Sequence, residues 1–69
     1  MRLSARNQFS GTVTAIKLGG VMAEIRVDIG GGHEMVSAIT RESADLLELG
    51  EGSSVTVIVK ATEVLIATD

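Results

Sequence analysis

The sequence contains no cysteine, proline, tryptophan or tyrosine, and Phe9 is its single aromatic residue. The absence of cysteine excludes disulfide bonds, thiolate metal ligands and cysteine nucleophiles. One histidine is too few for the zinc sites that proteins commonly build. A formal net charge of −3, without stacking aromatics, argues against a nucleic-acid partner. No apolar run is long enough to cross a bilayer and no signal-peptide pattern is present, so we expect a cytoplasmic protein without a membrane partner.

The chain is short for an independently stable fold. Its 69 residues make one domain, residues 1–69, and a domain of this size buries little apolar surface. Hydrophobic residues nevertheless make up 45% of the sequence, so much of the apolar surface must lie near the outside. We therefore expect an obligate homo-oligomer, in which contacts between subunits supply part of the missing burial.

Three segments in the first forty residues have the composition and spacing of β-strands. They span Phe9–Leu18, Val21–Ile29 and His33–Thr40, and glycine pairs or triplets separate them. The second segment alternates apolar and polar residues strictly, which predicts a strand with one buried face. The third has apolar residues on both faces, so both faces are expected to be covered.

Helical spacing replaces this alternation between Thr40 and Leu49. Thr40 is the expected N-cap, and Gly50 suits the helix end. The residues expected to face inward are Ala44, Leu46 and Leu47. Two further strands are predicted at Val55–Lys60 and Glu63–Ala67. Three strands, one short helix and two strands predict a mainly β protein, a small five-stranded β-barrel of the oligonucleotide- and oligosaccharide-binding (OB) type.

Side chains that can donate hydrogen bonds to an anion occur in three short segments of the sequence. Arg6 lies in Ser4-Ala5-Arg6-Asn7 and offers a planar fork of donors, while Lys60 in Lys60-Ala61-Thr62 adds a point charge. Thr40 and Ser43 add hydroxyls at the expected helix start. A site built of donors favours oxyanions that are fully deprotonated at neutral pH, such as molybdate, tungstate or sulfate, over hydrogen phosphate. The chemistry expected of such a site is binding.

These segments together resemble the molbindins, the single Mop-domain molybdate-binding proteins, over nearly the whole chain. The motifs that carry the resemblance are Ser4-Ala5-Arg6-Asn7, Gly11-Thr12-Val13, Gly20 to Ile25, Ile39-Thr40 with Ser43, and Val59 to Val64. The resemblance implies an OB-type barrel assembled as a hexamer, a trimer of dimers, that holds molybdate or tungstate at subunit interfaces for storage or homeostasis.

Position by position, the resemblance implies that Ser4 and Arg6 act with Lys60 and Ala61 of the same chain. Thr40 and Ser43 of a neighbouring chain would meet them. Ala5, Asn7 and Thr62 adjoin these positions and are counted with the oxyanion-binding site. Mop domains often have serine where this chain has Ala61, so a hydroxyl donor is missing there, although the backbone amide remains.

Each of these features also has a purely structural interpretation. Arg6 can be part of a solvated chain end, Lys60 can protect a strand edge from aggregation, and Thr40 can serve only as a helix cap. The alternative function is therefore an oligomerising structural or regulatory interaction module without anion binding. An enzyme is not expected, because no nucleophile, base or metal-ligand group stands out.

Overall fold

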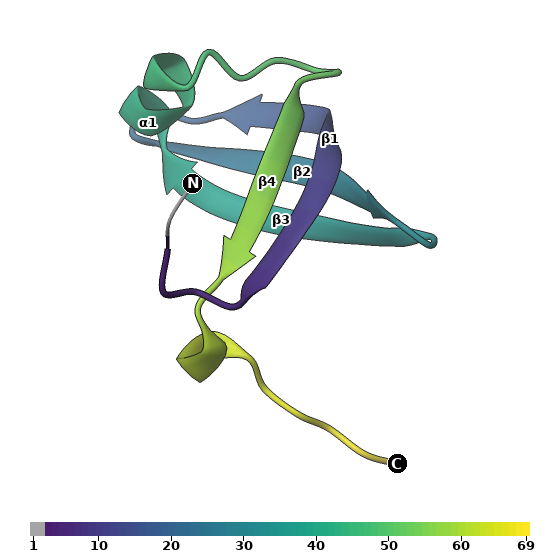
Figure 1. The fold of residues 1–69 in the computed structure, drawn as a ribbon. Coiled ribbons are helices and arrows are strands. Elements are labelled where there is room, and N and C mark those ends of the chain that lie inside the picture. Colours follow the sequence, from purple (N-terminus) through teal and green to yellow (C-terminus); the bar gives the residue numbers. More distant parts are fainter. Residues whose placement is uncertain (1–2) are drawn as a thin grey trace.

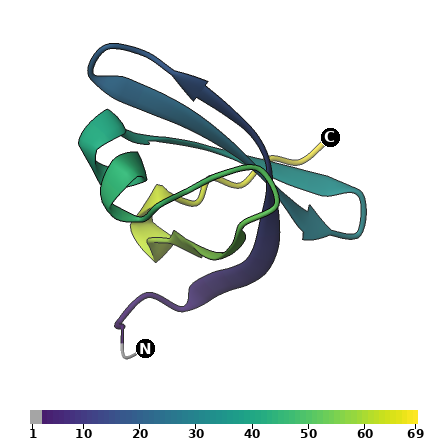
Figure 2. The ribbon, with the colours of Figure 1, turned by 90° about the horizontal axis from the view of Figure 1, so that it is seen from above.

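The computed structural model describes residues 3–69, and most of them form one curled antiparallel sheet with a short helix at one end (Figure 1). The elements in chain order are β1 (Asn7–Leu18), β2 (Met22–Gly30), β3 (His33–Thr40), α1 (Arg41–Leu46), β4 (Ser54–Val59) and the 3₁₀ turn η1 (Ala61–Glu63). The sheet order is β3-β2-β1-β4. Figure 2 shows from above how strongly the strands curve. The prediction of a mainly β fold with one short helix is confirmed.

Both hairpins form where glycines interrupt the strands. At the first, the Gly19 amide donates to the Met22 carbonyl at 2.7 Å and closes the turn between β1 and β2. At the second, Gly31 and Gly32 have φ of 63° and 79°, a region that residues with a Cβ rarely adopt. The predicted third strand, His33–Thr40, agrees with β3 at both ends.

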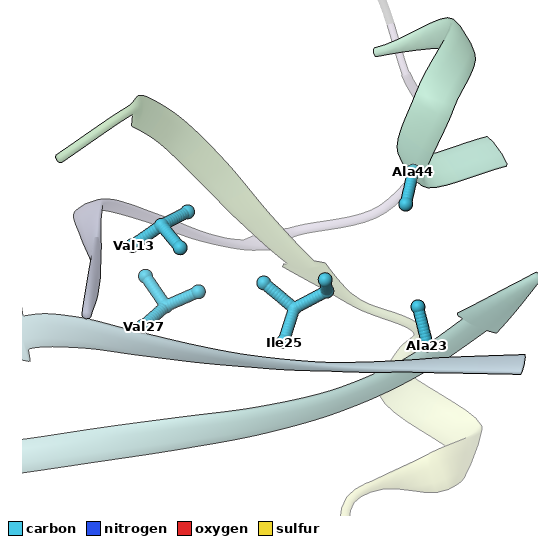
Figure 3. Close-up of a cluster of buried hydrophobic side chains, with 5 residues drawn as sticks. All are labelled: Val13, Ala23, Ile25, Val27 and Ala44. Carbon is cyan, nitrogen blue, oxygen red and sulfur yellow. The ribbon is translucent and has the colours of Figure 1, made fainter. Parts of the chain in front are cut away.

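The core lies on the concave face of the sheet and is built mainly by β2. Its buried side chains are Val13, Ala23, Ile25, Val27 and Ala44 (Figure 3). The alternation seen in the sequence places the apolar residues of β2 on this face, with Val27 paired to Val13 of β1. Gly11 allows β1 to approach closely, because a Cβ there would lie 2.5 Å from Val27 Cγ1 and 2.7 Å from the Asp28 carbonyl oxygen.

The helix begins as predicted but ends early. Thr40 is the N-cap, and its Oγ1 accepts the Ser43 amide at 3.0 Å. At the other end, the Leu49 amide donates to the Ala44 carbonyl and the Glu48 amide to the Asp45 carbonyl, the pattern of a Schellman motif. The left-handed residue that this motif requires is Glu48, with φ 53°, and not the expected Gly50.

The buried face of the helix is narrower than predicted. Ala44 is buried at 4% exposure, but Leu46 and Leu47 are 78% and 66% exposed, so their inward placement was wrong. The helix has only six residues, fewer than two turns, and Leu47 already lies beyond it as the C-cap, so only Ala44 of α1 is buried. Within residues 3–69, no helix has the length and apolar character needed to cross a bilayer.

The fifth strand, predicted at Glu63–Ala67, is not formed. After β4 the chain enters η1, and residues 64–69 extend away from the sheet without pairing to another strand of the described residues (Figure 1). Leu65 and Ile66 are 91% and 86% exposed. The composition favours a strand here, but a strand also needs an accessible partner, and η1 carries this segment away from both edges of its own sheet. The single chain is therefore a four-stranded half-barrel rather than a closed five-stranded barrel.

Candidate functional site

A shallow pocket of about 520 Å³ lies where the chain enters β1 and leaves β4. Its lining comes from the two terminal segments and one residue of β4: Leu3, Ser4, Ala5, Arg6, Ile58, Lys60, Ala61 and Thr62. The two cationic segments that the sequence analysis singled out, 54 positions apart from Arg6 to Lys60, thus lie side by side.

Antiparallel pairing of β1 with β4 produces this arrangement. Asn7 pairs with Val59, so the residues before β1 and after β4 leave the sheet at the same end. The Asn7 side chain donates from Nδ2 to the Val59 carbonyl at 3.2 Å and ties the two strands together. Asn7 therefore supports the pocket but is not among its lining residues. The Gln8 amide group donates to the Ala5 carbonyl at 3.0 Å and holds the incoming segment against β1.

The charge in this pocket is positive although the chain as a whole is negative. Arg6 and Lys60 are both exposed, and neither takes part in a salt bridge among residues 3–69. Ser4 and Thr62 add hydroxyl groups to the lining, whereas Ala61 contributes a methyl group. Two uncompensated cations beside neutral donors can bind an oxyanion but offer no group that would act as a nucleophile or general base.

Thr40 and Ser43 lie elsewhere in the same chain. They stand at the start of α1, at the opposite end of the sheet from η1 in Figure 1. Their hydroxyl groups are 2.7 Å apart, within hydrogen-bond distance of each other. One chain does not bring them to the pocket. Their role beside Arg6, as donors from a neighbouring chain, stays a prediction.

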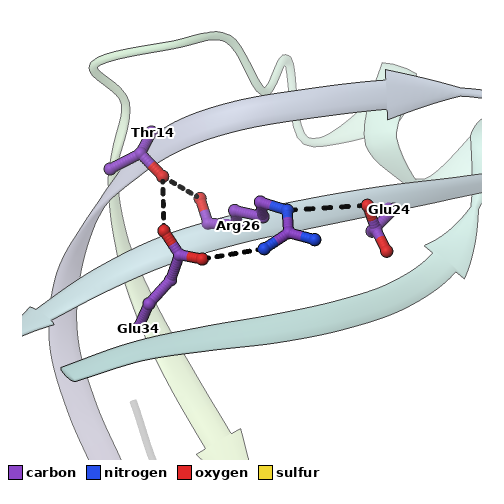
Figure 4. A network of polar contacts seen from close by, with 4 residues as sticks. All are labelled: Thr14, Glu24, Arg26 and Glu34. Atoms are coloured by element: carbon purple, nitrogen blue, oxygen red, sulfur yellow. Dashed lines mark hydrogen bonds and ion pairs between the residues drawn. The ribbon is translucent and has the colours of Figure 1, made fainter.

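Three further charged residues on the sheet, Glu24, Arg26 and Glu34, are paired with one another. On its convex face, Arg26 Nη1 donates to Glu34 Oε1 at 2.9 Å, and its Nε lies 3.6 Å from Glu24 Oε2 (Figure 4). Thr14 Oγ1 lies 3.4 Å from Glu34 Oε2 and 3.3 Å from the Arg26 carbonyl oxygen. The positive charge of Arg26 is therefore offset locally. Among residues 3–69, no three His, Asp or Glu side chains are placed to share a metal ion.

The sequence analysis missed the apolar part of the pocket, Leu3 and Ile58. Leu3 is 50% and Ile58 41% exposed. Ile58 faces the pocket because β4 alternates, so that its neighbours Val57 and Val59 point to the half-buried side. That alternation was visible in the sequence and could have identified Ile58 as an outward-facing residue.

The fold is a small curled β-sheet, and its pocket, where the chain enters β1 and leaves β4, is lined by cations and hydrogen-bond donors. These features define a class of anion-binding domain. Comparison with known proteins agrees with this class. The chain belongs to the TOBE domain family, whose model matches residues 3–66.

Two relatives cover the whole domain at high identity. Molybdenum-pterin-binding protein 2 of Clostridium pasteurianum is 42% identical over 66 residues, which are 96% of this chain and 97% of that protein. The molybdenum transport protein ModE of Azotobacter vinelandii is 42% identical over 69 residues. This chain spans only 26% of the length of ModE but nearly all of the clostridial protein. The names of these two relatives describe binding and transport and no catalysed reaction.

Solved structures of molybdate-binding proteins share the fold. A molybdate-binding protein from Sporomusa ovata superimposes with a TM-score of 0.93 at 44% identity, covering 99% of this chain and all of that one. The cytoplasmic molybdate-binding protein ModG, in a form with molybdate bound, gives a TM-score of 0.85 at 48% identity over 88% of this chain and 43% of that one. The resemblance to single-domain molybdate-binding proteins is confirmed.

Proposed function

We propose that this protein binds molybdate or tungstate reversibly in the pocket formed by its two terminal segments. The observation that carries the proposal is the meeting of Arg6 and Lys60, two cations without acidic partners among residues 3–69, in a chain of net charge −3. Molybdate and tungstate are dianions at neutral pH and accept hydrogen bonds from every direction. The binding of molybdate by proteins of the same fold and family supports the assignment.

The affinity required implies more donors than one chain supplies. Micromolar binding corresponds to roughly 8 kcal/mol, and charge-assisted hydrogen bonds contribute about 1.5 to 3 kcal/mol each before the entropy of association is subtracted. Arg6 and Lys60 with the hydroxyls of Ser4 and Thr62 approach this value only if all four converge. The remaining donors are Thr40 and Ser43 of a neighbouring chain, so the site is completed at a subunit interface.

The assembly follows from this requirement and from the exposed apolar surface. We assign the protein to a homo-oligomer, a hexamer built as a trimer of dimers, as the molbindin resemblance implies. Half-exposed apolar side chains beside the pocket, Leu3 and Ile58, support burial of this region between subunits. The physiological role is molybdenum storage or homeostasis in the cytoplasm, the compartment named for ModG.

The competing function is an interaction module that oligomerises without binding an anion. The exposed apolar residues favour assembly under either function, but the uncompensated cations favour anion binding. Thermal unfolding separates the two, because a ligand that binds only the folded protein raises the unfolding temperature. Molybdate is expected to stabilise the protein, and hydrogen phosphate is expected to have little effect.

Isothermal titration calorimetry of the native oligomer with molybdate, tungstate and sulfate is the direct test. Saturable binding of molybdate or tungstate at micromolar concentration is the expected result. A crystal grown with molybdate would then show electron density for the heavy atom beside Arg6. The proposal is wrong if neither oxyanion produces heat or a shift in unfolding temperature at millimolar concentration.

A further inference from the structure

Hydrogen-bond donors alone do not separate molybdate from sulfate. Both ions are tetrahedral dianions without a proton at neutral pH, and Arg6 and Lys60 can donate to either. Molybdate and tungstate are larger, because Mo–O and W–O bonds are longer than S–O bonds. The same charge spread over a larger ion is hydrated less strongly, so removal of water costs molybdate and tungstate less free energy than sulfate. A surface that displaces water without replacing its hydrogen bonds therefore favours the larger ions.

The pocket that holds the two cations has such an apolar surface. Its apolar lining residues among residues 3–69 are Leu3, Ala5, Ile58 and Ala61. Leu3 and Ile58 are the large ones, and they are half-exposed in the single chain. Both lie outside the core cluster of the sheet, so their side chains are available to contact an ion in the pocket.

The strand register places Ile58 beside the cationic segment. Ile58 of β4 pairs with Gln8 of β1, and paired residues of an antiparallel ladder project to the same face of the sheet. The Gln8 side chain donates from Nε2 to the Ala5 carbonyl at 3.0 Å, so it holds the incoming segment on that face. Arg6 follows Ala5 directly and lines the same pocket as Ile58. An oxyanion that Arg6 binds in this pocket therefore has an apolar side chain as a neighbour.

We infer that Leu3 and Ile58 are specificity-determining residues, which make the pocket select molybdate and tungstate over sulfate. The inference rests on the proposed function, since it concerns the ions that compete for the same site. Where the two side chains contact the anion, they displace water but donate no hydrogen bond, and this loss is greater for the more strongly hydrated sulfate. A neighbouring chain that completes the site would exclude more water and strengthen the selection. Arg6 and Lys60 thus supply affinity for dianions, and Leu3 and Ile58 determine which dianion is preferred.

Replacing Ile58 with threonine tests the inference, and Ile58→Val is the matched control. Threonine and valine have nearly the same shape, but only threonine has a hydroxyl that can donate to the anion in place of water. The native protein and both variants are titrated with molybdate in a calorimeter, first without sulfate and then with excess sulfate at constant ionic strength. The two titrations give the dissociation constants of both ions for one site. Val36→Thr introduces threonine at an exposed position of β3 that does not line the pocket.

We expect the ratio of the sulfate to the molybdate dissociation constant to fall several-fold in Ile58→Thr and to stay close to the native value in Ile58→Val and Val36→Thr. An unchanged ratio in Ile58→Thr, or an equal fall in either control, would overturn the inference and leave the proposed function intact. So would a native protein that binds sulfate as tightly as molybdate.

A native protein that binds no molybdate would overturn the proposed function and this inference together. Light scattering checks that each variant keeps its assembly. If Ile58→Thr loses its assembly, Leu3→Asn, a change of similar size before β1, must lower the same ratio of dissociation constants. An unchanged ratio in Leu3→Asn would then overturn the inference.

Discussion

Replacing Arg6 with alanine should weaken molybdate binding by about 10- to 100-fold. Arg6 lines the pocket together with Lys60 and has no acidic partner among residues 3–69, so its guanidinium is free to donate to a bound oxyanion. A charge-assisted hydrogen bond is worth about 1.5 to 3 kcal/mol, and 1.4 kcal/mol is a factor of ten in affinity. We take the lower part of this range because Arg6 is exposed in the single chain and water screens its charge.

The matched control is Arg26→Ala. It removes the same charge from the protein, so any general weakening of anion attraction affects both variants equally. Arg26, however, is paired with Glu24 and Glu34 on the convex face, away from the pocket. Its replacement should change the dissociation constant by less than about twofold, because long-range effects of exposed charges are largely screened at physiological ionic strength. Arg6→Lys keeps the charge but loses the planar fork, and should fall between Arg6→Ala and the native protein.

Calorimetric titration of the three variants and the native protein with molybdate measures these differences. Light scattering on the same samples checks that each variant retains its assembly. The reasoning would be refuted by wild-type affinity in Arg6→Ala, or by equal losses in Arg6→Ala and Arg26→Ala. The first result would show that Arg6 is not part of the site. The second would show that Arg6 acts only through the net charge of the protein.

Three further predictions concern stability and are measured by urea or thermal unfolding. Gly11→Ala should lower the free energy of unfolding by about 1 to 3 kcal/mol, because the new methyl group meets atoms of β2 closer than van der Waals contact allows. The control Gly20→Ala, which has open space around it, should change the free energy of unfolding by less than about 0.5 kcal/mol. Thr40→Ala should lower it by about 1 kcal/mol through loss of the helix cap, and Thr40→Ser should restore most of the loss. Glu48→Gly should raise it by up to about 1 kcal/mol, because glycine adopts the left-handed backbone at that position without strain. A stabilising Gly11→Ala, a neutral Thr40→Ala or a destabilising Glu48→Gly would each contradict the stated cause.

The features that local sequence could specify were predicted well. Alternation in β2 depends only on which residues share a face, so the buried row of Ala23, Ile25 and Val27 was evident from the sequence. Thr40 was identified as a cap because its hydroxyl is placed three residues before a free amide. The meeting of Arg6 with Lys60 was implied by the resemblance to molbindins, and in the structure the antiparallel pairing of β1 with β4 brings the two segments together.

The features that depend on contacts between distant segments, or on competition between local hydrogen bonds and residue preference, were not predicted. The helix ends at Leu46, with Glu48 as the left-handed residue after it, because hydrogen bonds of the Schellman motif outweigh the preference of that position for glycine, and Gly50 gave a misleading signal two residues later. The segment Glu63–Ala67 has the composition of a strand, but composition does not determine whether an unpaired strand edge of the same chain lies close enough to pair with it. Ile58 was not identified as a site residue, and its place in the pocket became evident only from the path of the neighbouring segments.

Two features of the single chain are incomplete, the set of anion donors and the β-barrel, and contact with a neighbouring subunit could complete both. The pocket holds Arg6 and Lys60 but lacks Thr40 and Ser43, which lie at the other end of the sheet, so one chain cannot gather all of the predicted donors. The sheet likewise lacks a fifth strand while residues 64–69 lack an edge. Both features involve η1, since Lys60 precedes it, Ala61 begins it, and residues 64–69 follow it. We therefore expect that a neighbouring subunit in contact with this region would also fix the position of Lys60, so that assembly would be a condition for an ordered anion site and not merely a source of buried surface.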